Sequence, residues 1–511
     1  MQSRQNVLFI VIDQLRADIV FGKLAASVDL PHLQALMAEA VTFKRHYSVT
    51  NPCGPSRASI LTGQYAMNHR SVHNGTPLRH DTANLATEAR KAGYLPLLFG
   101  YTDTSQDPRA YPPKDPALRS YEHPMRGFDE ALEMRFEQSY PWRADLIAKG
   151  YDVPDYKDFF RPKAAIGMLR KIDDPAFYSA DDSDTAFLTN ACLTSLAARR
   201  GAPWFAHLTY IRPHPPLVAP APYNRLYDPA MIPLPDRLPT PEAEAAAHPF
   251  FGPALARQSA ASMVSGFPDL VGDDATISAL RALYLGLATE VDHHIGRVIA
   301  FLKDTGQYDD TLLVVTSDHG EMLGDRHAWG KMSVYDAAYH SPLIIRDPRN
   351  PQAFGSEVNR PTESIDITPT ILDWIGQDVP PSMDGVALTP FLHGEQPVWR
   401  ETSFSELDFG DPLAPTLWQT ALDLGPGVAN LNILRGPRYT LVHFNAGLPP
   451  LLFDHEGDGE HRNIAADPAM APVLLEMTQK LLNHRMENAD HTLVTTMITQ
   501  AGAVQGQRQG R

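Results

Sequence analysis

Two short apolar runs of the chain are each followed by an acidic side chain. Asn6 to Ile12 (NVLFIVI) precedes Asp13, and Thr311 to Thr316 (TLLVVT) lies just ahead of Asp318. Continuous apolar, β-branched runs of this length predict strands buried on both faces, as in a parallel sheet. Because parallel strands end at one edge, both acids are expected there.

Two more strands, Gly93–Gly100 and Trp204–Tyr210, end in polar or proline-rich loops. Helical patterns at Leu33–Ala40, Ser56–Thr62 and Ile277–Thr305 separate the strands. This alternation predicts an α/β fold, a large and mostly parallel sheet sandwiched by helices. All four strand ends should then face one cleft, and a proline-dense segment, 211–239, is expected to form an ordered loop over it.

The alternation is lost near residues 379–399. Short antiparallel strands are expected at Tyr439–Phe444 and Leu451–Asp454, with a helix over Pro468–Met486 packed on them. The predicted organisation is a large α/β domain at 1–390, a smaller C-terminal α+β subdomain at 391–490 and a tail at 491–511. The tail shows little core pattern, so it is expected to be disordered or to reach onto another subunit as an oligomerisation arm.

The composition limits the classes of protein and partner that fit this chain. The 511 residues include 44 Lys plus Arg and 60 Asp plus Glu, a net charge of −16, with 43% hydrophobic residues. This excludes a disordered chain and disfavours nucleic acid and anionic membranes as partners. The apolar run at Asn6 is far shorter than the ~20 residues of a membrane span. With only Cys53 and Cys192, no disulfide framework is expected, and a cytoplasmic location is predicted.

Candidate chemistry begins at Cys53. It stands at the start of a predicted helix, where the helix dipole favours anions, and Arg57 lies one turn further on the same side. This arrangement predicts an anion site that contains a nucleophile. The alternative is a buried structural cysteine beside a surface arginine.

The motif resembles a known family signature. Residues 53–57 (CGPSR) match the Cys-x-Pro-Ser-Arg sequence of the sulfatases in the alkaline phosphatase superfamily, whose cysteine is oxidised to formylglycine. Further matches in the same order are the strand leading to Asp13, Leu61-Thr62-Gly63, Asp318-His319-Gly320 and Leu452-Phe453-Asp454 to Asn463. The resemblance covers nearly the whole chain and implies the alkaline phosphatase-like fold.

Details favour one branch of that family. Gln14 and His319 stand where common sulfatases carry Asp and Asn, and Tyr101 also departs from their pattern. These residues resemble the phosphonate monoester hydrolase and arylsulfatase branch, as do Met67-Asn68-His69-Arg70, Asn74 and Arg212-Pro213-His214-Pro215-Pro216. Asp103 replaces the threonine usual in that branch, and an extra anion there would disfavour negatively charged substrate oxygens.

The resemblance implies a complete site. One divalent metal ion, Mn²⁺ or alternatively Ca²⁺, would be bound by Asp13, Gln14, modified Cys53, Asp318 and His319, an oxygen and nitrogen set suited to such an ion. Formylglycine 53 would be the nucleophile. The other expected catalytic residues are Arg57, His214 and Lys331, and the expected substrate-binding residues are Asn74, Tyr101 and Asp103.

The predicted function is hydrolysis of singly charged esters, namely aryl sulfates and phosphonate monoesters or phosphodiesters, through a covalent formylglycine ester. One alternative is a phosphonate monoester hydrolase or phosphodiesterase with sulfatase only as a side activity. Another is a weak phosphatase or phosphodiesterase with unmodified Cys53, and a third is an inactive metal-binding relative. Expected partners are a small anionic ester, transiently a formylglycine-generating enzyme, and further copies in a homodimer or homotetramer.

Overall fold

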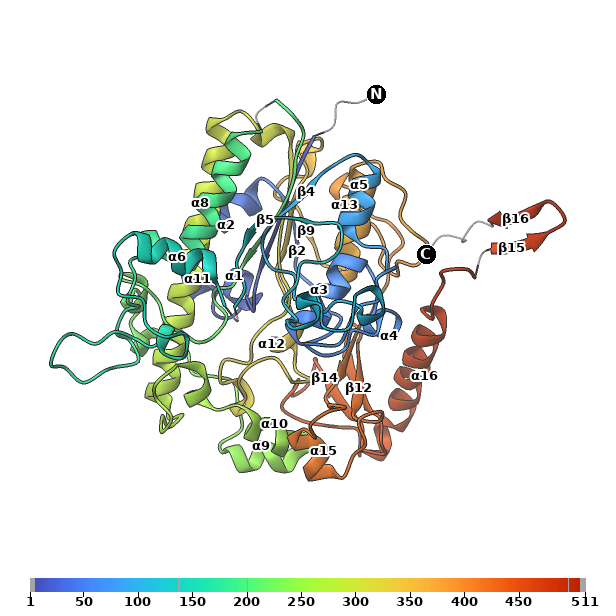
Figure 1. Ribbon diagram of the computed structural model, residues 1–511. Coiled ribbons are helices and arrows are strands. Elements are labelled where there is room, and N and C mark those ends of the chain that lie inside the picture. Colours follow the sequence, from blue (N-terminus) through green and yellow to red (C-terminus); the bar gives the residue numbers. More distant parts are fainter. Residues whose placement is uncertain (1–4, 137, 200, 495, 506–511) are drawn as a thin grey trace.

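A central sheet forms the body of the protein in the computed structural model, which describes residues 5–136, 138–199, 201–494 and 496–505. Within these residues the sheet has eight strands in the order β5-β4-β6-β1-β7-β8-β2-β9. Figure 1 shows this sheet between the helices. The strands are β1 Asn6–Ile12, β2 Val41–Phe43, β4 Pro96–Gly100, β5 Asp129–Glu133, β6 Phe205–Tyr210, β7 Thr311–Ser317, β8 Leu343–Arg346 and β9 Glu357–Val358.

The four predicted strands lie side by side at the centre of this sheet. Strands β4, β6, β1 and β7 run parallel, and Ile12 at the end of β1 is in register with Tyr210 of β6 and Ser317 of β7. Their carboxyl ends therefore share one edge, as predicted. Only β8 runs antiparallel to its neighbours, β7 and β2, so the predicted mostly parallel α/β sheet is confirmed.

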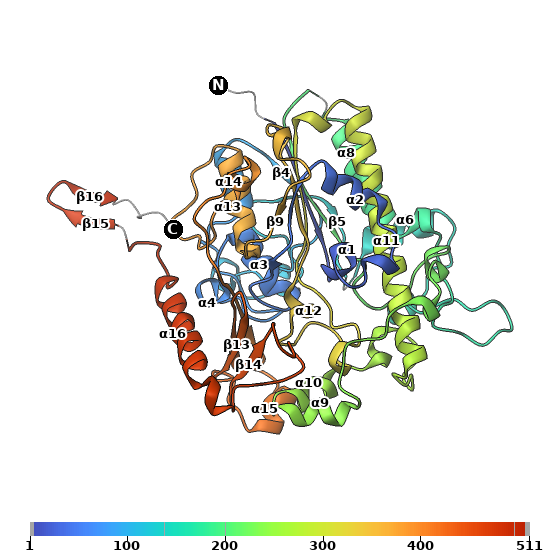
Figure 2. The same cartoon turned by 180° about the vertical axis from the view of Figure 1, so that it is seen from behind.

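Alternate side chains of β1 enter two different cores, because successive residues of a strand point to opposite faces. Leu8, Ile10 and Ile12 pack in the core with helices α2 (Pro31–Ala38), α8 (Asp184–Ala197) and α11 (Asp274–Asp304). Val7, Phe9 and Val11 pack with α3 (Cys53–Thr62), α5 (Leu85–Lys91) and α13 (Ile367–Trp374). Helices thus cover both faces of the sheet (Figures 1 and 2).

The C-terminal part is a smaller layer beside the main sheet. It contains the antiparallel strands β11 Ser403–Asp408, β12 Asn430–Arg435, β13 Tyr439–Phe444 and β14 Leu451–Asp454, with the helix α16 Ala471–Glu487. Met477 and Leu481 of α16 pack in one cluster with Leu441 of β13 and Leu452 of β14. The predicted antiparallel strands and the helix over them are confirmed, although Pro468–Met470 form a 3-10 turn before α16.

The tail beyond this subdomain forms a hairpin of β15 (Thr496–Thr499) and β16 (Gly502–Gln505), which projects from the body (Figures 1 and 2). The tail predicted for 491–511 also includes residues 495 and 506–511, which lie outside the described residues. The prediction that it reaches another subunit remains open.

Shorter elements complete the described chain. Residues 211–239 are irregular apart from the 3-10 turns Tyr223–Arg225 and Pro229–Met231. Among the described residues, no helix combines the length and apolar character needed to cross a membrane. The remaining elements are α1 Asp18–Phe21, β3 His46–Tyr47, α4 Ala66–His69, α6 Tyr140–Ala148, α7 Tyr156–Phe159, α9 Pro241–Ala247, α10 Phe251–Arg257, α12 Asp336–Tyr339, β10 Thr362–Glu363, α14 Thr389–Leu392 and α15 Leu417–Leu422.

Candidate active site

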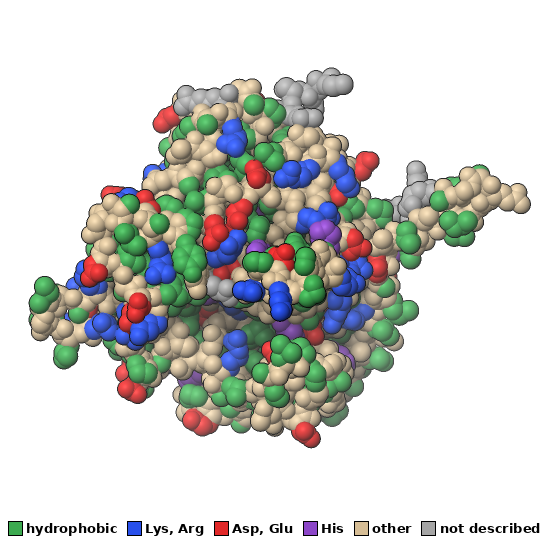
Figure 3. Space-filling model, in the orientation of Figure 1, with side chains coloured by type: hydrophobic (Ala, Val, Ile, Leu, Met, Phe, Trp, Pro, Cys, Tyr) green, Lys and Arg blue, Asp and Glu red, His purple; other side chains and the backbone are tan. Residues whose placement is uncertain are grey.

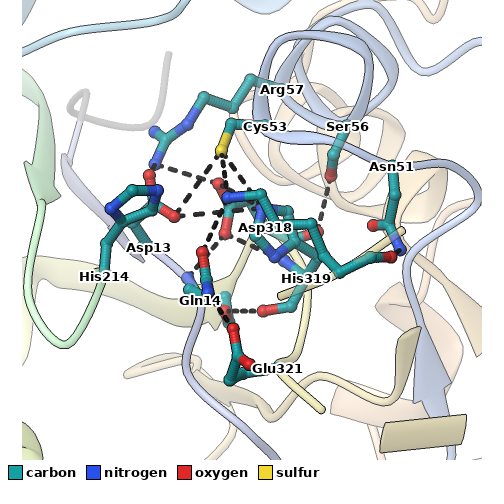
Figure 4. A network of polar contacts seen from close by, with 12 residues as sticks. Asp13, Gln14, Asn51, Cys53, Ser56, Arg57, His214, Asp318, His319 and Glu321 are labelled. Carbon is teal, nitrogen blue, oxygen red and sulfur yellow. Dashed lines mark hydrogen bonds and ion pairs between the residues drawn. The ribbon is translucent and has the colours of Figure 1, made fainter. Parts of the chain in front are cut away.

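Four side chains from separate parts of the sequence meet at the carboxyl edge of the sheet (Figure 4). Asp13 follows β1, Asp318 and His319 follow β7, and Cys53 opens α3; their ligand atoms all lie within 4.8 Å of one another. His319 Nε2 is 3.2 Å from Cys53 Sγ, and Asp13 Oδ1 is 3.8 Å from it. The structure therefore brings together the predicted nucleophile and four of the five predicted metal-binding positions, and Gln14 lies next to Asp13.

The start of α3 explains how Cys53 reaches this edge. The helix begins at Cys53 rather than at the predicted Ser56. Asn74 Oδ1 accepts a hydrogen bond from the Gly54 N–H (3.0 Å), which satisfies one of the free donors at the helix N-terminus. Ser56 Oγ donates to the backbone oxygen of Asp318, so the first turn of α3 is fastened to the end of β7.

Arg57 lies inside the site and is only 2% exposed, so the alternative of a surface arginine is wrong. Its Nη2 is 3.2 Å from Asp13 Oδ2 and 3.1 Å from Asp318 Oδ2, and its Nε is 3.6 Å from Asp103 Oδ2. Tyr101 stacks under the guanidinium, and its hydroxyl donates to Asp13 Oδ2 (2.6 Å). Arg57 thus lies among three clustered carboxylates and offsets part of their mutual repulsion.

Lys331 and His214 are partly exposed, unlike Cys53. Lys331 Nζ lies 3.0 Å from Cys53 Sγ and donates to Gln14 Oε1 (2.7 Å). Burial lowers the pKa of Lys331, but Cys53 and Asp13 outweigh this and raise it, so the ammonium form is favoured. Burial and Lys331 lower the pKa of His214 to about 3, which keeps its imidazole neutral at pH 7.

The space-filling view shows a hollow across the middle of the face seen in Figure 1, with Lys and Arg side chains on its rim (Figure 3). An overall net charge of −16 therefore does not prevent this face from offering cations to an anionic substrate.

The Cys53 thiol is poorly suited to act unmodified. Burial raises its pKa well above the ordinary value, and Asp13 and Asp318 raise it further against the opposing charge of Lys331. The thiolate, which is the nucleophilic form, is therefore scarce at neutral pH.

The site fits a divalent cation. Burial and the charge of Asp13 raise the pKa of Asp318 to about 7, and Asp318 Oδ2 accepts no hydrogen bond. His319 Nδ1 is hydrogen-bonded to the Gly320 oxygen (2.9 Å), which leaves Nε2 to act as a ligand. Buried carboxylate oxygens with one neutral imidazole are ligands that suit a metal ion such as Mn²⁺.

Two supporting residues were missed in the sequence. Asn51 donates through Nδ2 to the Lys331 oxygen (2.9 Å), and no sequence pattern marks it. Glu321 accepts a hydrogen bond from the Gln14 side-chain amide. Its position directly after the Asp318-His319-Gly320 motif is a signal that could have identified it.

Comparison with known proteins agrees with this fold. A phosphonate monoester hydrolase from Silicibacter pomeroyi has a structure with TM-score 0.98 and 64% identity, covering 99% of this chain and 100% of the other. The phosphonate monoester hydrolase of Agrobacterium radiobacter gives a TM-score of 0.93 at 40% identity, covering 99% and 100%. A "multifunctional alkaline phosphatase superfamily protein PehA" from Trinickia caryophylli is 39% identical over 503 residues, covering 96% of this chain and 97% of that protein.

The fold and the site define a hydrolase of the alkaline phosphatase superfamily. Residues 5–377 match the family model described as Sulfatase, and the chain belongs to that family.

Proposed function

We propose that this protein hydrolyses sulfate monoesters, phosphonate monoesters and phosphodiesters with formylglycine at position 53 and one divalent metal ion. One observation carries the proposal. Cys53 stands at the start of α3, and its Sγ lies within 4.8 Å of ligand atoms of Asp13, Asp318 and His319. Lys331 Nζ is 3.0 Å from the same sulfur. These are the groups needed to activate a nucleophile and to neutralise an anion beside it.

The modified residue would supply a hydroxyl nucleophile. The metal ion, for which Mn²⁺ is our first candidate and Ca²⁺ the second, would lower the pKa of that hydroxyl and polarise the ester. Asp13, Gln14, Asp318 and His319 would hold the ion. Arg57 lies between the Asp13 and Asp318 carboxylates and offsets part of their repulsion, and Tyr101 hydrogen-bonds Asp13.

The remaining groups would act on the substrate. Lys331 carries a proton close to Cys53 and is suited to protonate the leaving oxygen. His214, held neutral with its Nδ1 hydrogen-bonded to the Pro215 oxygen, can contact the leaving group from the partly exposed side of the site. Asn74, Tyr101 and Asp103 lie around Gly54 and Arg57, where the transferred group would bind.

A second candidate is a phosphonate monoester hydrolase or phosphodiesterase whose sulfatase activity is only a side reaction. The similarity at 64% identity to a phosphonate monoester hydrolase favours it. Rates measured side by side on an aryl sulfate and an aryl phosphonate monoester separate the two candidates.

A cysteine pair within the chain tests the proposal. Cys53→Ala is expected to lose hydrolysis of both esters, because one nucleophile serves both. Cys192→Ala is the matched control, since Cys192 is a buried thiol in α8, distant in sequence from the site. Loss of only one activity in Cys53→Ala would mean two separate sites. Full retention of both would rule out nucleophilic catalysis at position 53.

The proposal extends to partners and location. A formylglycine-generating enzyme would act on Cys53 before folding buries it, because Cys53 is only 5% exposed in the folded chain. We further propose that the protein works in the cytoplasm as a homodimer or homotetramer, with the C-terminal hairpin as the arm between copies.

A further inference from the structure

Glu321 is fully buried beneath the metal-binding side chains, and both of its carboxylate oxygens are used. Oε2 accepts a hydrogen bond from Gln14 Nε2. Oε1 accepts from the backbone N–H groups of Leu323 (2.9 Å) and Gly330. One side chain therefore contacts a proposed metal ligand and the backbone next to Lys331.

These contacts determine which way the Gln14 amide points. A carboxylate only accepts hydrogen bonds, so the end of the amide that faces Glu321 must be the NH₂ group. An ammonium only donates, so the end that faces Lys331 must be the carbonyl oxygen, Oε1. Glu321 and Lys331 therefore require the same orientation of the Gln14 amide. A flipped amide would place its NH₂ group against the Lys331 ammonium and its oxygen against the Glu321 carboxylate. Gln14 Oε1 is thus held toward Lys331 Nζ, which lies 3.0 Å from Cys53 Sγ.

The same carboxylate holds the loop that carries the ammonium group. Gly330 precedes Lys331 directly, and its φ of 76° lies in the left-handed region that favours glycine. The bond from Gly330 N to Glu321 secures this turn. A shift of Glu321 would therefore disturb the metal ligand and the proton donor together.

We propose that Glu321 is a positioning residue that orients the Gln14 carbonyl as a metal ligand and places Lys331 beside Cys53. The proposal rests on the proposed function, because it takes the ion to bind at Gln14. Outer-shell partners of this kind change metal affinity by about 10–100-fold when they are removed.

The test exchanges the two side chains. In Glu321→Gln, an NH₂ group meets the NH₂ of Gln14, so Mn²⁺ affinity should fall by about 10–100-fold and kcat on an aryl phosphonate should fall with it. The double variant Gln14→Glu with Glu321→Gln has the same net charge as the wild type. It restores a donor–acceptor pair with the roles exchanged, because position 14 now accepts and position 321 donates. Its Mn²⁺ affinity should return to within about tenfold of the wild type or exceed it.

Mn²⁺ affinity is measured on the isolated proteins by competition with a chelator, so the readout does not depend on turnover. Glu244→Gln is the matched control, because Glu244 is a buried glutamate of α9 that accepts from Leu238 N–H. It should leave Mn²⁺ affinity unchanged.

Unchanged affinity in Glu321→Gln would overturn the inference, as would an exchanged pair no better than Glu321→Gln alone. If Glu321→Gln does not fold, recovery of folding and Mn²⁺ binding in the exchanged pair supports the inference, and failure of the pair contradicts it. If the wild-type protein binds no Mn²⁺, that result would contradict the proposed metal-dependent function and also this inference, which rests on it.

Discussion

At the residue scale, the main feature of the site is a cluster of three acidic and two basic side chains. Asp13, Asp103 and Asp318 surround Arg57, and Lys331 supplies the second cation. Burial strengthens each of these interactions because the local dielectric is low. With all three carboxylates ionised, the five side chains and a divalent ion would carry about one net positive charge, which matches an ester with a single negative charge.

Asp103→Asn tests this balance. Burial raises the pKa of Asp103, so the comparison is made at a pH high enough to ionise it. There, removing the carboxylate should raise kcat/KM for a doubly charged aryl phosphate by roughly tenfold relative to a singly charged aryl phosphonate monoester, because one repulsive charge near Arg57 is lost. Steady-state kinetics on both esters gives the ratio. Asp310→Asn, an exposed acid, is the control for net charge. A ratio that stays at the wild-type value would show that Asp103 does not select substrate charge.

Asp13, Cys53, Asp318 and His319 could be predicted because each follows a buried strand or opens a helix within a short motif. The Gln14–Glu321 contact could not, since it depends on how two loops 307 residues apart pack against each other. The position of Arg57 among three carboxylates is likewise a property of the folded site.

At the element scale, the four central strands of the main sheet were predicted, whereas the short buried strands β2 and β8 and the edge strand β5 were not. Strand β1 matches its prediction at Asn6–Ile12 because all its residues are apolar or buried. Strand β5 (DEALE) is an edge strand with exposed acidic residues, so its sequence carries no apolar signal. The prediction for α3 began three residues late, at Ser56, although the first turn of a helix accepts a proline such as Pro55.

Gly320 fixes how β7 meets α12. A Cβ at this position would lie 2.0 Å from the backbone oxygen of Ala337, which cannot move aside as a side chain could. Gly320→Ala should therefore lower the free energy of unfolding by about 1–3 kcal/mol or more, measured by chemical denaturation. Gly252→Ala in α10 is the control, because nothing lies within 4 Å of its Cβ. Equal stability of the two variants would refute the close packing at Gly320.

At the scale of the whole molecule, the site should couple metal binding to stability. An ion that binds only the folded chain adds about 2.7 kcal/mol at a free concentration 100 times Kd. Mn²⁺ should therefore raise Tm in a concentration-dependent way, a chelator should reverse the rise, and Asp318→Asn should abolish it. A wild-type Tm that does not respond to Mn²⁺ would speak against the ligand set.

The projecting hairpin points to association. Met497 is 66% exposed and Ile498 is 80% exposed, and residues 492–507 contain no charged side chain. An isolated two-stranded hairpin is marginally stable in water, so a second copy is the expected partner for this surface.

Deletion of residues 491–511 tests the arm. The full chain is expected to be a dimer or tetramer by light scattering, and the shortened chain is expected to be a smaller species, because the apolar hairpin is gone. Ile498→Asp should weaken assembly similarly, whereas Leu413→Asp, a change at an exposed leucine elsewhere, should not. A full-length monomer, or an unchanged mass after deletion, would show that the hairpin is not the arm.

The chemical state of residue 53 decides the proposed mechanism most directly. Peptide mass spectrometry across residues 51–57, on protein produced together with a formylglycine-generating enzyme, should find the aldehyde at position 53 and an intact thiol at Cys192. An unmodified Cys53 in such protein, with ester hydrolysis still present, would contradict formylglycine catalysis.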